Sequence, residues 1–506
     1  MALRVDASDA IGTGHLMRCL TLAEALAGEG HSCRFILRDL PGALPGLVEA
    51  RGHAVSLLPA PTPGEPTDAD LAHGAWLGVT RARDAAETAA VLGEPVDWLV
   101  VDHYALAADW HRGLRPHARR LLAIDDLADR ALDCDLLLDQ NLQAAPDRYA
   151  GLLPAACEAL IGPKYALLRP EFAALRAAPP PRDPGRVLVS FGGIDAPGAT
   201  LMALEALALA GMDARPVDVV AGPRNPHLPA IRAWCAARAQ ATWHESADMA
   251  ALMVRAGLAI GAAGATAWER CCLGLPTLLV TIAANQRPGA QALAEAGAAL
   301  WAGDVDRTAH DLAAMLLTLE RAPGLRDSLG TKAAALVDGL GVARVVRAMT
   351  TPAIALRPAR AEDCDTVWQW RNDERTRRFI PDPAPILLES HRVWFAGVLS
   401  GERAVDLLIG EAAGQPVGVL RFDHAGPLAT ISIYLVPGRE NRGEGRALLR
   451  AGHDWLAAHR PATEVIEALV LEGNAASHRA FQAAGYRPYA STWRCAIRRG
   501  ENEARP

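Results

Sequence analysis

The sequence contains no run of about 18 uncharged apolar residues, which is the length that a membrane-spanning helix needs. Its start, MALRVDASDAIG, carries an acidic residue where a secretory signal peptide has its apolar core. These two absences predict a cytoplasmic protein that has no membrane partner.

Cysteine patterns typical of zinc sites are also missing. The nine cysteines are an odd number without CxxC spacing, and the adjacent Cys271 and Cys272 lie in an apolar stretch. We therefore expect buried free thiols and no metal. The formal net charge of −7 leaves no positive excess, so we expect no nucleic-acid partner, and any polyanionic ligand must be bound by a local site.

At 506 residues the chain is too long for one ordinary core, so two or three domains are expected. Strand-like apolar runs alternate with Ala/Leu-rich helical stretches, which is typical of parallel βα units. These runs are 33–37, 98–102, 121–125, 135–139, 187–190, 217–221, 258–261 and 278–280, with a proline cluster at 179–184 between the two groups. The predicted fold is α/β, with two doubly wound lobes at 1–175 and 185–348 and a ligand where the strands end.

A second break near 349–352 precedes a segment of different character. A strand is expected at 353–357, followed by a helix that contains Trp368 and Trp370, and then by strands at 405–409, 417–422 and 430–436. The last strand leads into a basic glycine turn and another helix. We predict a third domain of the α+β class at 353–500.

The segment Gly12-Thr13-Gly14-His15 places an imidazole at a glycine-rich turn between a strand and a helix. The free backbone N–H groups at such a helix start can face an anion. A dinucleotide-binding interpretation is weak, because the motif needs a third small residue where this chain has Met17. The structural alternative is a glycine turn with a histidine that faces solvent.

Other loops also place polar residues directly after apolar strands. In the first lobe these tips are 102–104, 125–126 and 139–141. In the second lobe, Gly192 and Gly193 form a turn that can bind a diphosphate, with Thr200 near the next helix start. Glu269 can accept the two hydroxyls of a ribose, or it is simply an exposed carboxylate on a helix.

Several motifs, matching in order over roughly 1–345, resemble the nucleotide-sugar hydrolases of the pseudaminic-acid pathway. They are 6–18, 101–104, 124–127, 162–169, 190–195 and the pair Asn285-Gln286. The resemblance implies a fold similar to the two-lobed (GT-B) glycosyltransferases, with UDP bound in the second lobe. It also implies metal-independent hydrolysis of UDP-2,4-diacetamido-2,4,6-trideoxy-β-L-altrose, which releases UDP and inverts the anomeric configuration.

The same resemblance implies roles for individual residues. His15 would be the general base, because the dipole at a helix N-terminus disfavours protonation of a neutral imidazole. Tyr104 and Asn285 complete the expected catalytic set. The expected substrate and UDP contacts are Gly14, Gly192, Gly193, Asp195, Thr200, Glu269 and Gln286.

The turn at 437–447 opens a helix after a strand, and its Arg442-x-x-Gly445-x-Ala447 spacing suits a pyrophosphate. Together with 472–477, Phe481 and 485–486 it resembles the GCN5-related N-acetyltransferases (GNAT). The segments 370–372 and 390–395 are similar to the branch that contains the pathway's UDP-4-amino-sugar N-acetyltransferase. The acetyl-CoA contacts that this implies are Val436, Arg442, Gly443, Gly445, Ala447, Asn474 and Ser477.

One position departs from that family's pattern. Many members have a tyrosine seven residues after the asparagine, where it protonates the leaving thiolate, and this chain has Phe481. Tyr434, Tyr486 or a water molecule would then do so. Candidate bases for the incoming ammonium are Glu411, His391 and His424, each of which also has a structural interpretation.

These features predict a bifunctional enzyme that uses acetyl-CoA to acetylate the 4-amine of a UDP-amino sugar and then hydrolyses the product to release UDP. Three alternatives stay open. The first is a UDP-sugar glycosyltransferase, the second a hydrolase of a related legionaminic-type pathway, and the third a nucleotide-sugar-binding sensor without activity.

Overall fold

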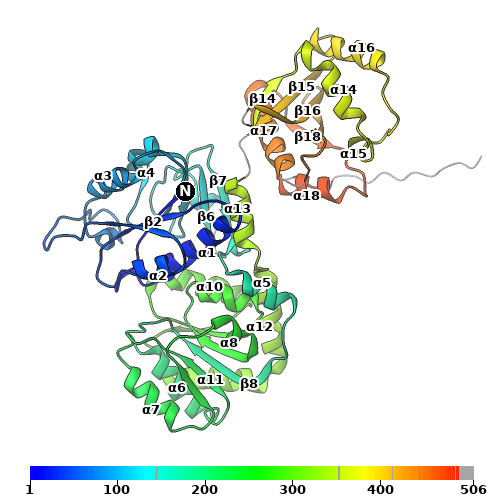
Figure 1. Ribbon diagram of the computed structural model, residues 1–506. Helices are drawn as coiled ribbons and strands as arrows, with labels where there is room; N and C mark the ends of the chain where they lie inside the picture. The colour runs from blue at the N-terminus through cyan, green and yellow to red at the C-terminus, as the bar shows by residue number, and fades with distance from the viewer. Residues whose placement is uncertain (143–145, 351–353, 413, 441–442, 485, 489–506) are drawn as a thin grey trace, which may run out of the picture. The chain divides into compact units, whose positions relative to one another are not determined.

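The computed structural model describes residues 1–142, 146–350, 354–412, 414–440, 443–484 and 486–488 (Figure 1). The chain divides into two compact units, with the boundary between Met349 and Thr350. Three sheets organise it, two in the first unit and one in the second. Each unit is described by itself below.

The first lobe is built on a seven-stranded parallel sheet with the strand order β3-β2-β1-β4-β5-β6-β7. Its strands are β1 (Ala2–Val5), β2 (Arg34–Arg38), β3 (Ala54–Leu58), β4 (Val96–Asp102), β5 (Ala118–Ile124), β6 (Leu136–Asp139) and β7 (Glu158–Ile161). Its helices are α1 (Gly14–Gly28), α2 (Pro45–Ala50), α3 (Arg81–Leu92) and α4 (Ala108–Leu114), with short 3₁₀ turns η1 (Gly74–Leu77), η2 (Arg115–His117), η3 (Pro146–Tyr149) and η4 (Pro163–Tyr165). Because apolar cores lie on both faces, the central strands are nearly all apolar rather than alternating.

The second lobe contains a six-stranded parallel sheet with the order β10-β9-β8-β11-β12-β13. Its strands are β8 (Asp183–Ser190), β9 (Val217–Val220), β10 (Ala241–His244), β11 (Ala256–Gly261), β12 (Thr277–Thr281) and β13 (Leu300–Asp304). Its helices are α6 (Ala199–Leu209), α7 (Leu228–Ala236), α8 (Met249–Arg255), α9 (Thr266–Cys272), α10 (Arg287–Glu295), α11 (Ala309–Arg321) and α12 (Pro323–Leu336), with the turn η5 (Ala284–Gln286). Both faces again carry buried apolar clusters.

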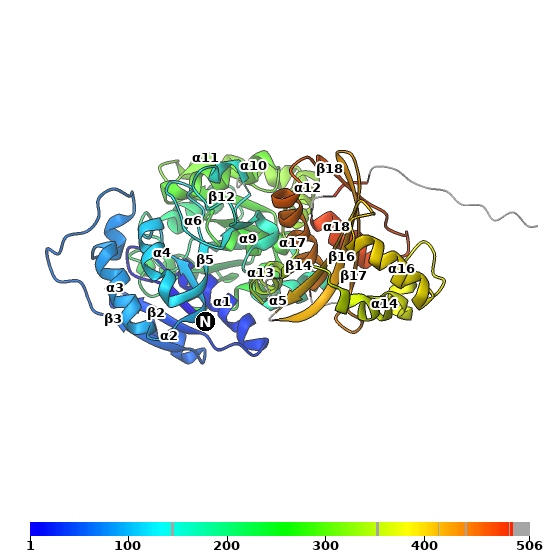
Figure 2. The ribbon, with the colours of Figure 1, turned by 90° about the horizontal axis from the view of Figure 1, so that it is seen from above.

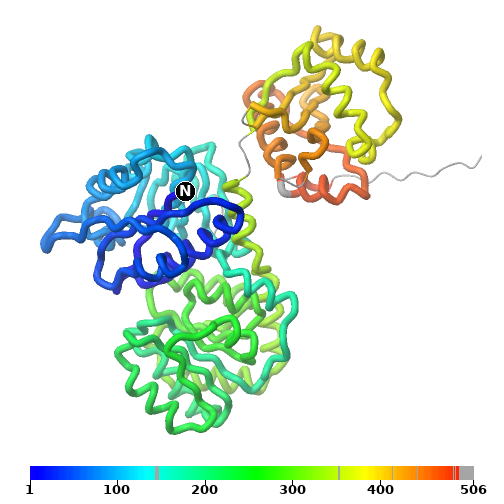
Figure 3. Tube along the Cα trace, in the orientation of Figure 1, coloured from blue at the N-terminus to red at the C-terminus, as the bar shows by residue number. Residues whose placement is uncertain are grey.

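Two helices cross between the lobes, and the chain can be followed through them in Figure 3. Helix α5 (Pro170–Ala177) buries Phe172 in the core of the second lobe, against the cluster that contains Trp268. Helix α13 (Gly341–Thr350) returns to the first lobe, where Val345 joins the core of that lobe and Trp98 Nε1 donates a hydrogen bond of 2.9 Å to the carbonyl of Met349. The predicted boundaries at 175 and 348 place these helices with the lobe that precedes them in sequence, whereas their apolar faces pack on the other lobe.

The second unit has a five-stranded mixed sheet with the order β14-β15-β16-β17-β18, antiparallel except between β17 and β18. Its strands are β14 (Ala355–Pro358), β15 (Val405–Ala412), β16 (Gln415–Ala425), β17 (Leu428–Leu435) and β18 (Val465–Ala468). Its helices are α14 (Cys364–Asn372), α15 (Glu374–Arg377), α16 (Leu388–Leu399), α17 (Glu444–His459) and α18 (Ala475–Ala483), with the turn η6 (Ala361–Asp363). Helices α14 and α16 pack on one face of the sheet and α17 and α18 on the other (Figure 2).

The predicted fold class is confirmed, with two doubly wound parallel lobes followed by an α+β unit. No helix within the described residues combines the length and apolar character that crossing a bilayer requires. The described cysteines are unpaired thiols, and six of these eight are buried, as expected.

Candidate active sites

Asp102 holds His15 in place at the start of α1. Helix α1 begins at Gly14, so His15 lies in its first turn, and Asp102 ends the neighbouring strand β4. The Nδ1 atom of His15 is 2.6 Å from Oδ1 of Asp102, whose side chain is fully buried. An ionised carboxylate only accepts hydrogen bonds, so Nδ1 carries the hydrogen and the lone pair of Nε2 is available to take a proton.

Arg18 keeps Asp102 ionised. Burial alone would raise the pKa of Asp102, but Arg18 and His15 together hold it well below its usual value. The guanidinium donates from Nε to Oδ2 and from NH2 to Oδ1 of the carboxylate, both at 2.6 Å. This two-bond contact fixes the carboxylate plane and therefore the orientation of the imidazole.

Aromatic side chains line one side of His15. The Tyr104 ring meets the imidazole edge-on, with ring centroids 4.7 Å apart, and Trp76 from η1 stacks on Tyr104 at 5.8 Å. The Tyr104 hydroxyl donates to Oδ1 of Asp126 at 2.5 Å, and Asn141 Nδ2 donates to Oδ2 of the same carboxylate at 3.1 Å. Burial, followed by the charge of Asp126, raises the pKa of Tyr104, so its hydroxyl stays protonated and acts as a donor.

In the second lobe, Asp195 caps α6, the helix that follows the predicted diphosphate-binding turn. Its two carboxylate oxygens accept hydrogen bonds from the backbone N–H groups of Ala199 and Thr200 at 3.0 and 2.8 Å. Gly192, at φ 89°, and Gly193 form the turn after β8 as expected. Because Asp195 occupies two donors of α6, a diphosphate in this loop would rely on other backbone N–H groups.

Glu269 is half-buried rather than exposed on its helix. Its side chain is only 17% exposed, Oε1 lies 3.6 Å from NH2 of Arg169, and Oε2 is buried without a hydrogen-bond partner among the described residues. Burial raises the pKa of Glu269 to about 7, although Arg169 opposes this shift. The carboxylate therefore has an unused acceptor atom, which is the group that a ribose hydroxyl needs.

Gln286 and Asn285 lie in the short turn η5. Gln286 Oε1 accepts a hydrogen bond from the backbone N–H of Ile282 at 3.1 Å, and its Nε2 would be 3.9 Å from a methyl group placed on Gly264. Asn285 is exposed. The loop that precedes α9 and the η5 turn are thus neighbours, as the proposed UDP set requires.

An ion pair links the two lobes near the His15 loop. Arg224, which follows β9, contacts Asp9, which precedes Gly12 in the chain. The imidazole of His15 contacts the Tyr104 ring in the first lobe, and the Gly264 loop neighbours Gln286 in the second.

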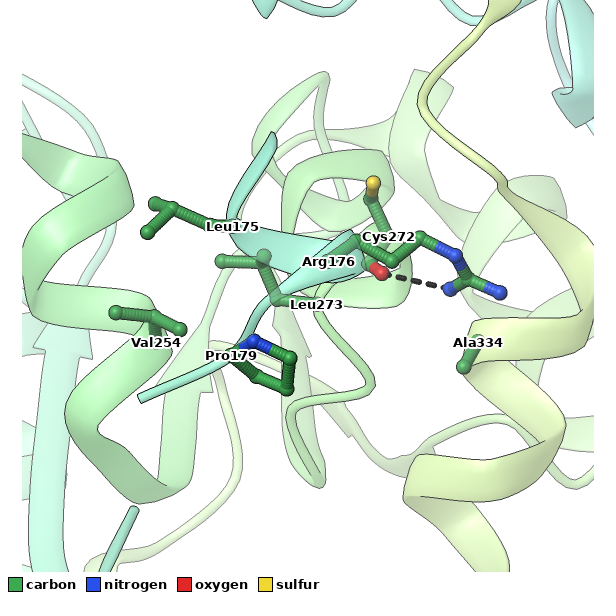
Figure 4. Close-up of a pocket in the computed structure, with 7 residues that line it drawn as sticks. All are labelled: Leu175, Arg176, Pro179, Val254, Cys272, Leu273 and Ala334. Atoms are coloured by element: carbon green, nitrogen blue, oxygen red, sulfur yellow. Dashed lines mark hydrogen bonds between the residues drawn. The ribbon is translucent and has the colours of Figure 1, made fainter. Parts of the chain in front are cut away.

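A cavity of about 270 Å³ lies away from these residues (Figure 4). It is lined by Leu175, Arg176, Pro179, Val254, Cys272, Leu273 and Ala334. Arg176 NH1 is already bonded to the carbonyl of Cys272 at 2.8 Å. The cavity contains none of the predicted site residues.

The predicted acetyl-CoA turn joins β17 to α17. Val436 follows β17 directly, and Gly443, at φ 77°, forms the N-cap of α17, whose first turn contains Gly445 and Ala447. Arg442 lies outside the described residues. Arg439 Nε donates to Oε2 of Glu444 at 2.9 Å, which keeps that carboxylate from the open end of the helix.

Asn474 is the N-cap of α18, where its Oδ1 accepts a hydrogen bond from Ser477 N–H at 3.0 Å. These two expected acetyl-CoA contacts are therefore joined by a hydrogen bond. Phe481 is buried and packs edge-on against Tyr486 with ring centroids 4.9 Å apart. The Tyr486 hydroxyl lies 2.8 Å from His453 Nε2.

The three candidate bases of acetyl transfer all make structural contacts. The contacts are Glu411 with Arg357 at 2.7 Å, His391 with the carbonyl of Cys364 at 3.0 Å, and His424 with Asp406 at 2.7 Å. These hydrogen bonds explain why the three residues are present without giving any of them a catalytic role.

Sequence reasoning did not assign roles to Asp102, Arg18, Asp126 or Trp76. Asp102 and Asp126 carry a usable signal, because Asp102 ends β4, the neighbour of the strand that leads to His15, and Asp126 follows β5, the next strand in the sheet. Trp76 has no such signal, since it lies in a short turn far from the motif in sequence. No group of three or more His, Cys, Asp or Glu residues in the described part of the chain is arranged to hold a metal ion.

Two family models match the chain. Residues 354–487 match the acetyltransferase (GNAT) domain, and residues 238–335 match the glycosyltransferase family 28 C-terminal domain. The first match covers nearly all of the described second unit, and the second covers the loops with Glu269 and Gln286.

Two curated relatives share sequence with the chain. The spore coat polysaccharide biosynthesis protein SpsG of Bacillus subtilis is 32% identical over 189 residues, which are 36% of this chain and 56% of the relative. The UDP-2,4-diacetamido-2,4,6-trideoxy-β-L-altropyranose hydrolase of Campylobacter jejuni is 27% identical over 170 residues, which are 33% of this chain and 52% of the relative. The chain thus spans about half the length of the curated relatives it matches.

Among solved structures, MurG of Acinetobacter baumannii is similar at 17% identity and a TM-score of 0.48, over 69% of this chain and 98% of that one. The resemblance expected from the motifs is confirmed by the sequence relatives and the family models. The chain thus joins a region similar to nucleotide-sugar hydrolases and to the C-terminal domain of family 28 glycosyltransferases to a C-terminal region that matches the GNAT acetyltransferase domain.

Proposed function

We propose that the first unit hydrolyses a UDP-linked diacetamido sugar of the pseudaminic type, and that the second unit acetylates the 4-amine of its UDP-amino-sugar precursor. The observation that carries the hydrolase proposal is His15, held at a helix start by a buried, ionised Asp102. This arrangement is that of a general base whose proton-accepting nitrogen is set by its partner.

In the hydrolytic step, Nε2 of His15 removes a proton from a water molecule while the water oxygen attacks the anomeric carbon. The bond between that carbon and the diphosphate oxygen breaks, UDP leaves, and the configuration inverts. Asp102 stabilises the imidazolium that forms, because it is an anion in contact with Nδ1. Tyr104 and the stacked Trp76 provide a rigid wall for the sugar or the water.

UDP would be held in the second lobe. The unused Oε2 of Glu269 accepts ribose hydroxyls, the Gly192-Gly193 turn faces the diphosphate, and Gln286 contributes its amide. Asn285, exposed on the same turn as Gln286, would reach the sugar. Asp195 and Thr200 support this site by fixing the start of α6.

In the acetyl-transfer step, the neutral amine nitrogen attacks the thioester carbon of acetyl-CoA, the carbon–sulfur bond breaks so that CoA leaves as a thiolate, and the nitrogen gives up a proton to water. The helix start at Gly443 to Ala447 would bind the pyrophosphate of the cofactor, and the Asn474–Ser477 cap its pantetheine arm. Phe481 carries no hydroxyl, so the CoA thiolate would take its proton from water, Tyr434 or Tyr486.

Incubation of the full chain with acetyl-CoA and the UDP-4-amino sugar tests both activities. We expect CoA release, then UDP release, and a free inverted sugar by NMR. His15→Ala should abolish UDP release and leave CoA release intact. UDP release by His15→Ala at the wild-type rate would contradict the role of His15, and no CoA release from the wild type would contradict the second activity.

The match to family 28 glycosyltransferases favours a second candidate, in which a sugar hydroxyl replaces water as the acceptor. Free sugar formed in the absence of any other acceptor supports hydrolysis. A requirement for an added acceptor supports the transferase.

A further inference from the structure

We propose that Cys134 and Cys157 form a modification site, a thiol pair that hydrogen peroxide oxidises to a reversible disulfide. The two residues lie outside the sites described above, and the inference does not depend on the proposed function. The disulfide would fasten the edge strand β7 to its neighbour β6.

The two sulfur atoms are in contact at the start of neighbouring strands. Cys134 lies two residues before β6 and Cys157 lies directly before β7, and their Sγ atoms are 3.6 Å apart. A disulfide bond is about 2.05 Å long, so the sulfurs need to approach by only about 1.5 Å. The residues that follow the two cysteines are already joined, because the N–H of Glu158 donates to the carbonyl of Asp135 at 3.0 Å. The pair is therefore assembled before any oxidant arrives.

The two thiols have different environments, which assigns them different roles. Cys134 is 1% exposed, whereas Cys157 is only partly buried and can be reached by a small oxidant. The hydrogen bond from Cys134 lowers the pKa of Cys157, and burial and the nearby carboxylates of Asp135 and Glu158 oppose this shift without reversing it. The same contact, together with burial, raises the pKa of Cys134. Cys157 is therefore the thiolate that reacts first, and Cys134 is the thiol that completes the bond.

The oxidation consumes one molecule of hydrogen peroxide. The Cys157 thiolate attacks a peroxide oxygen and the oxygen–oxygen bond breaks, which leaves a sulfenic acid on Cys157 and a hydroxide that takes up the proton released by the thiol. The Cys134 sulfur then attacks the sulfenic sulfur, the sulfur–oxygen bond breaks, and the oxygen leaves as water with the Cys134 proton. Two thiols lose two electrons, and the peroxide is reduced to two water molecules. Two molecules of glutathione reverse the bond by thiol exchange and leave as glutathione disulfide.

The disulfide would hold an edge strand at a second point. Strand β7 is the last in the order of the first sheet and pairs with β6 on one side. The chain between the two strands is already tied at the end of β6, where the Tyr149 hydroxyl donates to Oδ2 of Asp139 at 3.0 Å. Cys134 is about 16 Å from Asp139 along the strand, so the new bond lies at the opposite end of β6. Both ends of the connection are then fixed in the oxidised protein.

Peptide mapping of the full chain tests the bond itself. Trypsin cleaves after Arg130, Arg148 and Lys164, which places the two cysteines on the separate peptides 131–148 and 149–164. After one equivalent of hydrogen peroxide and alkylation of the remaining thiols, we expect these two peptides to be linked and two fewer thiols to be alkylated. Addition of glutathione should separate the peptides again.

Three variants assign the roles. Cys157→Ser should give no linked peptide and leave Cys134 free for alkylation under denaturing conditions. Cys134→Ala should stop at the sulfenic acid, which dimedone traps on Cys157. Cys364→Ser is the matched control, since Cys364 is another partly buried thiol but belongs to the second unit, and it should form the same linked peptide as the wild type.

Hydrogen exchange tests the consequence for the fold. We expect the amides of β7 to exchange about 10- to 100-fold more slowly in the oxidised wild type than in the reduced protein, because the closed loop restricts opening of the edge. Strand β3, at the other edge of the same sheet, is the internal control and should be unaffected. Cys157→Ser treated with peroxide should keep the exchange rates of the reduced protein.

The outcomes that contradict the proposal are distinct. Alkylation of both Cys134 and Cys157 after peroxide treatment would overturn the site, as would a sulfinic acid on Cys157 without a linked peptide. Links from either residue to other cysteines, as abundant as the link between the two, would overturn the pairing. A linked peptide with unchanged exchange in β7 would overturn the effect on the edge strand.

Discussion

At the scale of single residues, Asp102 determines which nitrogen of His15 carries the hydrogen. Asp102→Asn removes the charge and permits the other tautomer, so we expect kcat of UDP release to fall about 10²- to 10⁴-fold. KM for the UDP-sugar should change little, because the proposed UDP contacts lie in the second lobe. Steady-state kinetics of UDP release measures both parameters.

CoA release by the same Asp102→Asn preparation is the internal control and should be unaffected. An unchanged kcat for UDP release would show that His15 does not depend on this contact. A rise in KM without a fall in kcat would assign Asp102 to substrate binding.

Glu269 makes the stability of the first unit depend on pH. Burial raises the pKa of Glu269 to about 7 in the folded state, above its unfolded value of 4.5. Folding therefore favours the protonated form of Glu269. Its contribution to the free energy of unfolding is fully present below pH 4.5 and is lost as the pH rises through about 7. A shift of this size corresponds to at most about 3 kcal/mol.

We expect Glu269→Gln, which stays neutral, to lose less stability than the wild type between pH 5 and pH 8 in denaturant unfolding. Burial also raises the pKa of Asp139 to about 7, so Asp139 adds its own pH dependence to the stability of both proteins. The difference between the two pH profiles isolates the contribution of Glu269. Parallel pH profiles of wild type and Glu269→Gln would contradict the raised pKa.

Sequence patterns located some of these residues and not others, for physical reasons. His15 and Tyr104 could be predicted to meet, since each follows a strand and the two strands are neighbours in the sheet. The glycine turn before α6 was ambiguous, because a helix start accepts an anion from a ligand or from its own chain. Asp195 supplies that anion here, and nothing in the spacing distinguishes the two cases.

At the scale of elements, α5 links the first lobe to the core of the second. Phe172 is fully buried there, and Phe172→Ala should lower the free energy of unfolding of the first unit by about 3–5 kcal/mol. Leu175, which is only partly buried beside the cavity in Figure 4, is the control. Leu175→Ala should cost less, and an equal loss in calorimetry would contradict the packing described.

Helical periodicity predicts that α13 is a helix with an apolar face, and the structure agrees. The periodicity does not indicate which residues pack against that apolar face. Val345 belongs to the same apolar cluster as Leu3, which is more than 300 residues away in the chain, and only the folded structure shows this. The strands β3, β7, β10, β13 and β18 were missed for a related reason, since each lies at the edge of its sheet and lacks the long buried apolar run of a central strand.

At the scale of the whole molecule, the two units have separate cores and should unfold separately. We expect two transitions in calorimetry of the full chain. CoA at about 100 times its Kd should stabilise one of them by about 2.7 kcal/mol. Phe172→Ala should lower the other, and a single transition that responds to both changes would contradict the independence of the units.

The two crossing helices α5 and α13 have a consequence for movement. The chain passes between the lobes of the first unit twice, and each passage ends in a helix anchored in the opposite core. A single connection would let one lobe rotate about any axis, whereas two connections restrict the rotation to a hinge axis that passes through both. Any relative motion of the two lobes would then be confined to rotation about the line that joins the two helices, which would keep the path of His15 relative to the second lobe reproducible.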